Sequence, residues 1–424
     1  MIPHEAASTR AFVIHPDMRR DDTRHAPIYA LGEATSLALA LPGLEVVGSE
    51  VVRLATPQPK TLFGSGKVLE LKAMFAAAEA ELVLIDGPVS PKQQRNLEKA
   101  WNVKILDRTG LILEIFSDRA RTREGVLQVE MAALSYQRTR LVRAWTHLER
   151  QRGGLGFVGG PGETQIEADR RAIDEQIISL KRQLGKVVRT RELHRAGRAK
   201  VPFPIVALVG YTNAGKSTLF NRLTGADVLA KDMLFATLDP TMRRVKLDTG
   251  AEIILSDTVG FISNLPTQLV ASFRATLEEV LEADLVLHVR DISHPETEEQ
   301  KADVEDILSN LGMPEHIPVL ELWNKIDLLG EEKAHALALR AEREEGVLAI
   351  SSITGFGLPR LLEMVTTTLD SERHETTLTL AFSAGRERAW LFREGVVQAE
   401  RQTEEATEVD VLWTARQSAR FRDL

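Results

Sequence analysis

One short segment of the chain has the residue types and the spacing of a phosphate-binding loop. The apolar run 205–209 is followed directly by Gly210, Tyr211, Thr212, Asn213, Ala214, Gly215, Lys216 and Ser217. These eight residues fit the pattern G-x-x-x-x-G-K-[ST] between a predicted strand and a predicted helix. The glycines let successive backbone N–H groups point into one concavity, and the helix amino terminus adds positive potential. We therefore expect Lys216 to reach the β- and γ-phosphates of a nucleotide and Ser217 to ligate Mg²⁺.

Two further segments would complete the metal and γ-phosphate site. The first, after the strand predicted over 253–256, consists of Asp257, Thr258, Val259 and Gly260. Asp257 is placed to hold Mg²⁺, directly or through water, and the Gly260 N–H to sense the γ-phosphate. The second segment precedes that strand and consists of Phe235, Ala236, Thr237, Leu238 and Asp239. We expect Thr237 to complete the Mg²⁺ shell, with Thr241 as its competitor and an ordinary loop threonine as the alternative.

Guanine selection is predicted from the segment after the strand expected over 319–323. It consists of Asn324, Lys325, Ile326 and Asp327. The Asp327 carboxylate can accept hydrogen bonds from the ring N–H and the exocyclic amine of guanine. Adenine offers neither donor, so the mismatch is worth on the order of 10⁴-fold in discrimination. A weaker prediction places Ser351, Ser352 and Ile353, at the end of the last strand, on the other side of the base.

The residue after Gly260 bears on the rate of hydrolysis. Many GTP-hydrolysing switches have a glutamine there, which orients the attacking water. This chain has Phe261, which has no group to hold a water molecule. We expect slow hydrolysis by the isolated protein, on the order of 10⁻³ s⁻¹.

A second Gly-rich segment, 64–67, lacks the first glycine and the final hydroxyl of the phosphate-loop pattern. We therefore do not expect a second nucleotide site there.

Alternating strands and helices predict a multidomain α/β protein. In the amino-terminal domain (1–121) we expect strands at 11–14, 44–47, 82–85 and 103–106 and helices at 25–41, 68–80 and 91–101. A basic hairpin (122–200) follows, with helices at 122–152 and 165–195 and a Gly-rich tip at 153–162. The GTPase domain is expected at 201–371, with strands at 205–209, 244–247, 253–256, 285–291, 319–323 and 347–350. A small α+β domain (372–424) is expected last, with strands at 376–382 and 409–413 and a helix at 384–395.

Composition and charge limit the remaining classes of function. The chain has no cysteine, which excludes disulfides, thiolate metal sites and a cysteine nucleophile. It has no apolar run of the roughly 20 residues that a membrane helix needs and no signal-peptide core, so we expect a cytoplasmic protein. The net charge is −8, yet residues 118–200 hold about 18 Lys/Arg against about 10 Asp/Glu. That basic stretch is either a surface facing nucleic-acid phosphates or a solvated helix face.

Taken together, these motifs resemble the HflX family of ribosome-associated P-loop GTPases. The resemblance also rests on segments outside the nucleotide motifs, namely 107–109, 115–120, 124–125, 127–130 and 161–165. It implies a Ras-like GTPase domain after the hairpin, and a monomer that binds the large ribosomal subunit and its rRNA. It further implies a role in splitting or rescuing ribosomes or in their assembly. Ser352 is a departure, because the family usually has alanine there.

Two other readings of the sequence stay open beside a ribosomal GTPase. The chain could be an rRNA-binding scaffold whose GTP site is catalytically minor, although intact Lys216, Ser217, Asp257 and Asp327 argue against this. A tRNA-modifying or metal-transport GTPase is disfavoured by the lack of cysteine and of a membrane span.

Asn213 resembles the asparagine of potassium-stimulated GTPases, which implies K⁺ beside the phosphates. The alternative is that Asn213 only pins the loop by hydrogen bonds.

Overall fold

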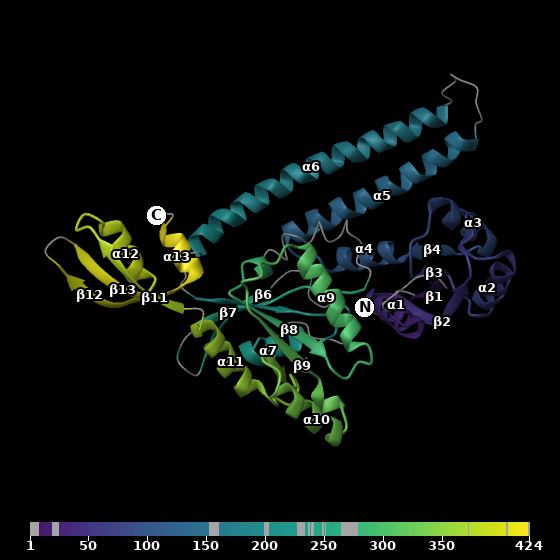
Figure 1. Cartoon of the computed structure of the whole chain (residues 1–424). Helices are drawn as coiled ribbons and strands as arrows, with labels where there is room; N and C mark the ends of the chain where they lie inside the picture. The colour runs from purple at the N-terminus through teal and green to yellow at the C-terminus, as the bar shows by residue number, and fades with distance from the viewer. Residues whose placement is uncertain are drawn as a thin grey trace, which may run out of the picture.

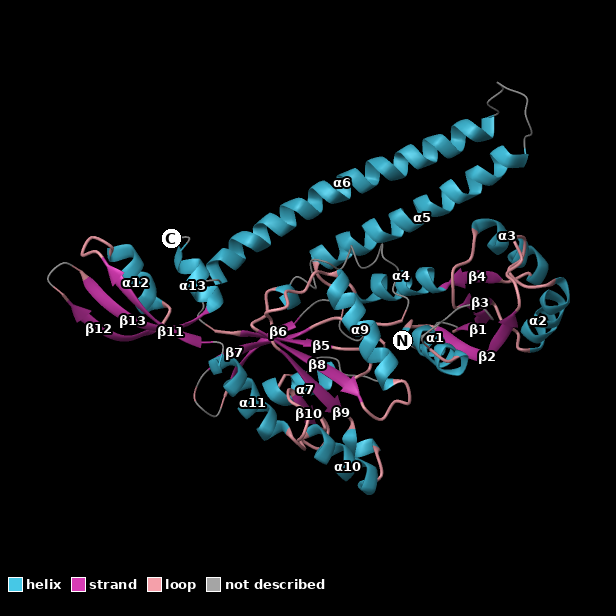
Figure 2. Ribbon diagram, viewed as in Figure 1, coloured by secondary structure: helices cyan, strands magenta, loops and turns pink. Residues whose placement is uncertain are grey.

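The computed structural model describes most of the chain. The described residues are 8–18, 25–151, 161–198, 203–226, 234–235, 238, 241–247, 250, 252–263, 279–371, 373–403 and 406–422. They form an amino-terminal α/β domain, a long helical hairpin, a second α/β domain and a small α+β domain at the carboxyl end (Figures 1 and 2). This mixed α/β architecture is the one predicted. Within the described residues, no helix is long and apolar enough to cross a membrane.

The amino-terminal domain has a parallel sheet in the order β2-β1-β3-β4. Its strands are β1 (Thr9–Met18), β2 (Leu44–Leu54), β3 (Leu82–Ile85) and β4 (Lys104–Asp107). Its helices are α1 (Pro27–Ala40), α2 (Ser65–Ala77), α3 (Pro91–Trp101) and α4 (Arg108–Arg119). The predicted limits of β3 and α3 match the structure. For α3 the reason is local, because Ser90 and Gln93 form a capping box at its start.

Helix α4 was not predicted from the sequence. It starts directly after β4, where the Asp107 carboxylate accepts a hydrogen bond from the Gly110 N–H at 2.9 Å. Its apolar residues are buried: Leu111, Ile112, Leu113, Ile115 and Phe116. Only Glu114, Ser117 and Asp118 form an exposed face. The nearly continuous apolar run 111–116 reads equally well as a buried strand, so its sequence alone does not identify a helix.

The hairpin consists of α5 (Arg123–Gln151) and α6 (Pro161–Arg198), which run side by side (Figure 1). On α6, Ile177 is buried, and the apolar residues at helical spacing around it are half-buried: Ile173, Leu180, Leu184 and Val187. An Arg138–Asp174 ion pair of 2.8 Å also joins the helices. Residues 153–160 of the Gly-rich tip, and Arg152 before them, lie outside the described residues. Pro161 and Gly162, predicted as part of the tip, instead begin α6, and proline suits the first position of a helix.

The GTPase domain has a six-stranded sheet in the order β10-β9-β8-β5-β7-β6. Its strands are β5 (Ile205–Val209), β6 (Thr241–Lys246), β7 (Glu252–Asp257), β8 (Leu285–Asp291), β9 (Val319–Asn324) and β10 (Val347–Ala349). All of them are parallel except β6, which pairs antiparallel to β7. Around them lie α7 (Lys216–Thr224), α9 (Thr297–Asn310), α10 (Glu331–Ala341), α11 (Leu358–Ser371) and the 3₁₀ turn η1 (Ile326–Leu328).

The carboxyl-terminal domain has an antiparallel sheet in the order β11-β13-β12. Its elements are β11 (Arg373–Leu380), α12 (Gly385–Arg393), β12 (Val397–Gln402), β13 (Thr407–Thr414) and α13 (Ala415–Arg422). Its core centres on Trp413, whose ring lies 5.4 Å from that of Phe421. Strand β12 and helix α13 were not predicted, because both are mostly polar.

One apolar core continues from the amino-terminal domain into the GTPase domain. Leu111 and Phe116 of α4 belong to the same buried cluster as Phe235 and Phe261 of the GTPase domain. The rings of Phe116 and Phe235 pack edge to face at 4.7 Å between centroids. The two α/β domains therefore share a hydrophobic interface directly beside the predicted phosphate loop.

Candidate nucleotide site

The phosphate loop connects β5 to α7 and depends on its two glycines. Gly210 and Gly215 both have positive φ angles, of 149° and 98°. A Cβ atom on Gly210 would lie 2.2 Å from the Val289 carbonyl oxygen, and one on Gly215 would lie 2.2 Å from Asn324 Nδ2. Any larger residue at either position would push the loop away from its neighbours. The backbone can therefore take this path only with glycine.

Lys216 is the first residue of α7 and is buried in the loop. Its Nζ donates hydrogen bonds to the Tyr211 carbonyl oxygen at 2.8 Å and to the Gly210 carbonyl oxygen at 3.1 Å. Burial lowers the pKa of Lys216 to about 8, although nearby Asp257 opposes that shift. Anionic phosphates would favour the charged ammonium and raise this pKa. Phosphates bound in the loop would therefore offset the free-energy cost of burying the charged ammonium.

Two oxygen ligands suited to Mg²⁺ meet at the start of α7. The Ser217 hydroxyl donates a hydrogen bond of 2.7 Å to Asp257 Oδ2, and Asp257 is fully buried at the end of β7. A carboxylate and a hydroxyl fit Mg²⁺, which takes oxygen ligands and usually keeps waters and substrate phosphates as well. Among the described residues no three His, Cys, Asp or Glu side chains gather into a metal group. The donor set therefore fits a cation held jointly with phosphate oxygens.

The structure settles only part of the predicted 235–239 segment. Ala236, Thr237 and Asp239 lie outside the described residues. The side chains of Phe235 and Leu238 are buried in the apolar core between the two domains. With these side chains buried, a nucleotide contact from either residue would come from its backbone, and the nucleotide role of this segment stays a prediction.

On the guanine side, Asn324 links three loops. Its Nδ2 donates to the Ala214 carbonyl oxygen at 2.7 Å, and its Oδ1 accepts from the Ser352 N–H and hydroxyl, both at 3.0 Å. The predicted segments at 324–327 and 351–353 thus meet the phosphate loop in space. Asp327 itself is exposed on η1, where it can face a base.

Lys325 has a partner that the sequence did not suggest. Its Nζ lies 2.8 Å from Oδ2 of Asp291, the last residue of β8. An aspartate at the carboxyl end of a central parallel strand was a usable signal, because the other site residues occupy the same edge of the sheet.

The turn at Gly260 is attached to the phosphate loop by backbone hydrogen bonds. The Thr212 N–H donates to the Phe261 carbonyl oxygen at 2.7 Å, and the Phe261 N–H donates to the Gly210 carbonyl oxygen at 3.2 Å. The Phe261 side chain is 1% exposed and packs in the core between the domains. A side chain enclosed in this core has no position from which to hold the attacking water.

A buried polar network, not predicted from the sequence, joins the amino-terminal domain to the same turn. The Tyr211 hydroxyl donates to the Glu33 carboxylate of α1 and accepts from the Ser263 N–H at 2.7 Å. Arg108, at the start of α4, pairs with Glu33, donates to Asp86 Oδ1 at 2.6 Å and donates to the Ser263 carbonyl oxygen at 2.9 Å. Burial alone would lower the pKa of Arg108, but the two carboxylates outweigh it and raise that pKa.

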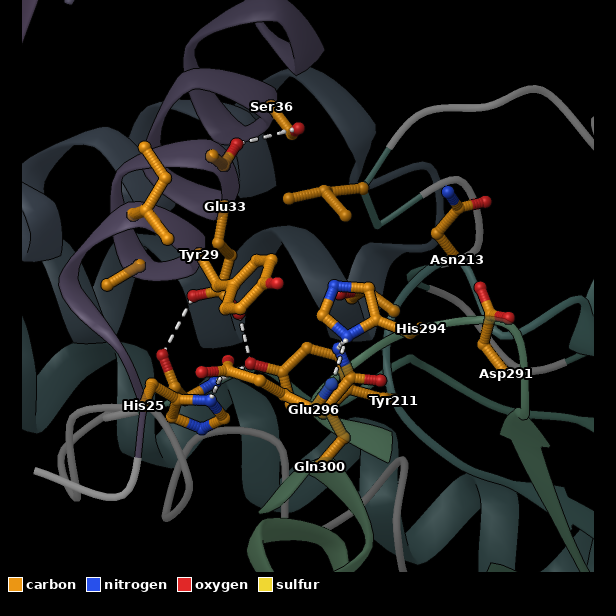
Figure 3. A pocket seen from close by; sticks show the side chains of 16 residues that line it. His25, Tyr29, Glu33, Ser36, Tyr211, Asn213, Asp291, His294, Glu296 and Gln300 are labelled. Carbon is orange, nitrogen blue, oxygen red and sulfur yellow. Dashed lines mark hydrogen bonds and ion pairs between the residues drawn. The ribbon is translucent and has the colours of Figure 1, made fainter. Parts of the chain in front are cut away.

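A cleft between α1 and the phosphate loop runs past this network. Figure 3 shows residues that line it, among them His25, Glu33, Tyr211, Asn213 and Glu296. His25 lies 2.7 Å from Asp303 Oδ2 and 2.8 Å from Glu296 Oε2, both on or next to α9. Hydrogen bonding to Asp303, followed by that to Glu296, raises the pKa of His25 to about 9 against the opposing effect of burial. A protonated histidine thus holds the two domains together at neutral pH.

Two other sequence features have structural roles. Lys67 of the 64–67 segment forms ion pairs with Glu50 at 2.7 Å and with Glu70 at 2.8 Å.

On the amino-terminal sheet, the Asp107 carboxylate accepts hydrogen bonds from Tyr136 at 2.6 Å and from Arg140 at 2.9 Å, both on α5. Asp107 therefore anchors the hairpin to the end of β4.

Four known families match consecutive parts of the chain. Their descriptions are GTP-binding GTPase N-terminal (residues 29–117), GTP-binding GTPase Middle Region (119–198), 50S ribosome-binding GTPase (205–325) and HflX C-terminal domain (336–423).

Similar proteins cover most of the chain. A GTPase HflX from Magnetococcus marinus is 50% identical over 385 residues, which cover 91% of this chain and 88% of that protein. A GTPase HflX from Escherichia coli is 46% identical over 344 residues, covering 81% of this chain and 80% of the relative. Among solved structures, a GTP-binding protein from Sulfolobus solfataricus in complex with GDP aligns with 86% of this chain and 99% of its own, at 22% identity and a TM-score of 0.45.

Proposed function

Because the chain belongs to the HflX family of GTPases, we propose that it binds the ribosome, chiefly the large subunit and its rRNA, and splits, rescues or helps to assemble ribosomes. The chain is a GTPase that converts GTP to GDP and phosphate. The ribosomal role is supported by the match of residues 205–325 to a family described as a 50S ribosome-binding GTPase. In the proposed function, this domain hydrolyses GTP while the basic hairpin binds the ribosome.

In the proposed site, the phosphates lie in the loop from Gly210 to Ser217. Lys216 binds the β- and γ-phosphates, and the Gly260 N–H binds the γ-phosphate. Ser217, Thr237 and Asp257 would hold Mg²⁺, which neutralises charge on the β- and γ-phosphates when it is bound. Asp327 reads the base, with Asn324 fixing the loop that carries Ser352 against the phosphate loop.

Asn213 is the residue we propose to hold K⁺ beside the phosphates. It is exposed at the cleft with a φ of 60°, and within the described part of the chain no hydrogen bond to its side chain is found. That observation favours a side-chain oxygen available to a cation over an asparagine that only pins the loop.

The hairpin is the proposed rRNA contact. The described part of α6 carries exposed basic side chains along its length: Arg170, Arg171, Lys181, Arg182, Lys186 and Arg189. Lysine and arginine side chains that neutralise rRNA phosphates release counterions, so binding should weaken with salt.

Cosedimentation with purified ribosomal subunits would test this function. We expect the protein to pellet with large subunits more strongly with a non-hydrolysable GTP analogue than with GDP. A variant in which residues 153–160 are replaced by a short turn should lose ribosome binding or ribosome splitting and keep its GTP affinity within a few-fold. Normal splitting by that variant, or equal binding to both subunits in both nucleotide states, would contradict the proposal.

A further inference from the structure

Three described groups near the phosphate loop are not available to orient the attacking water. Phe261, at the position where other GTPases place a glutamine, is buried in the interdomain core. The Tyr211 hydroxyl is engaged by Glu33 and Ser263. Lys216 is committed to the phosphates by its place in the loop. Among the described residues, the candidates that are left to orient the water are the other side chains of the loop.

Thr212 is the loop residue next to the point where a γ-phosphate would lie. A Cβ atom built on Gly260 would be 2.9 Å from Lys216 Nζ and 2.9 Å from both Cα and Cγ2 of Thr212. The Gly260 turn, the lysine ammonium and the Thr212 side chain thus meet at one place. Since Lys216 and the Gly260 N–H are the groups that bind a γ-phosphate, Thr212 borders the same phosphate.

The Thr212 hydroxyl is buried without a partner. The residue is 7% exposed, and none of the described residues hydrogen-bonds its Oγ1. Its methyl group makes the contact with Gly260, and valine would make that contact equally well. A buried hydroxyl that lacks a hydrogen bond is unfavourable, so packing alone does not account for threonine here.

The cleft beside α1 reaches the residue that carries this hydroxyl. Thr212 lines the cleft together with Tyr211 and Asn213, which Figure 3 labels. The cleft therefore leads from solvent to this part of the phosphate loop.

We propose that Thr212 is a catalytic residue whose Oγ1 accepts a hydrogen bond from the attacking water and donates one to a γ-phosphate oxygen. The water oxygen bonds to the γ-phosphorus, while the bond from that phosphorus to the β–γ bridging oxygen breaks and leaves its electron pair on GDP. The proton of the water passes to the released phosphate, and Thr212 keeps its own. The residue thus contributes positioning without any net proton transfer.

Three substitutions separate the hydroxyl from the methyl group. Thr212→Val keeps shape and methyl but removes the hydroxyl, Thr212→Ser does the reverse, and Thr212→Ala removes both. Single-turnover GTP hydrolysis should fall between about 10- and 100-fold in the valine and alanine variants and stay within about 3-fold in the serine variant. GTP and GDP affinities should stay within a few-fold in all three. Binding of GDP with aluminium fluoride, which mimics the transferring phosphoryl group, should weaken in the valine and alanine variants only.

Several outcomes would overturn this proposal. Hydrolysis by Thr212→Val at the wild-type rate would remove any role for the hydroxyl. A serine variant as slow as the valine variant would assign the effect to packing against Gly260. A valine variant with a normal rate alone and a loss only with large ribosomal subunits would mean that Thr212 contacts a partner's group and not the water.

Discussion

The two ends of the nucleotide site are built differently. The guanine end is made within one domain, where Asn324 joins the phosphate loop to Ser352 through three hydrogen bonds. The γ-phosphate end involves two domains, because Tyr211 and Ser263 of the GTPase domain are held by Glu33 and Arg108 of the amino-terminal domain. In the proposed site, the groups that select the nucleotide therefore belong to one domain, whereas the groups around the hydrolysed bond depend on how the two domains pack.

The largest expected effect is at the guanine end. Asp327→Asn should lower GTP affinity on the order of 10⁴-fold and make xanthosine triphosphate the preferred ligand, because an amide can donate to the xanthine oxygen. Competition binding with the two nucleotides would measure this change. Glu332→Gln, which removes the same charge from the nearby start of α10, should leave affinity unchanged. Equal competition by ATP and GTP in the native protein would show that Asp327 does not read the base.

Breaking the interdomain network should cost stability and leave nucleotide selection intact. Arg108→Met removes the shared partner of two buried carboxylates, so we expect a loss of about 3–5 kcal/mol in the free energy of unfolding. Lys67→Met, which breaks the more exposed pair with Glu50, should cost about 1 kcal/mol or less. Urea unfolding of the whole chain would compare the two variants. Similar losses in both would indicate that the Arg108 network does not hold the domains together.

The His25 contact should make interdomain packing dependent on pH. Its pKa of about 9 in the folded protein exceeds the ordinary value of 6.5, so the folded state holds the proton more tightly. The stabilisation is therefore complete below about pH 6.5 and is lost as pH rises through 9, with a slope of at most about 1.4 kcal/mol per pH unit. Unfolding measured from pH 6 to 10 should show this decline, and His25→Gln should flatten it. An unchanged slope in the variant would assign the decline to other groups.

The smallest effect is expected from the cation. If Asn213 holds K⁺ beside the phosphates, hydrolysis should be a few-fold faster in KCl than in NaCl at matched ionic strength, because added positive charge stabilises the transferring phosphoryl group. Asn213→Ala should remove this difference. Equal rates in the two salts for the native protein would leave Asn213 with a purely structural role in the loop.

The same contrast separates what the sequence could predict from what it could not. The strand β5 and the loop that follows it were predicted to the residue, because a continuous apolar run and a glycine pattern carry local information. Asp291, Glu33 and Arg108 were not predicted as parts of the site, since their partners lie far away in the sequence and depend on domain packing. Helix α4 was missed because its nearly continuous apolar run 111–116 is as typical of a buried strand as of a helix. Thr237 stays a prediction.

The length of α6 has a mechanical consequence. The helix has 38 residues and ends at Arg198. Six residues separate it from β5, which runs directly into Gly210 of the phosphate loop. At 1.5 Å per residue, α6 is a rod of about 57 Å. A tilt of about 5° at one end of such a rod moves the other end by roughly 5 Å, which is about one helical turn. A small rotation at one end of the hairpin is thus enough to move its other end by about the length of a side chain.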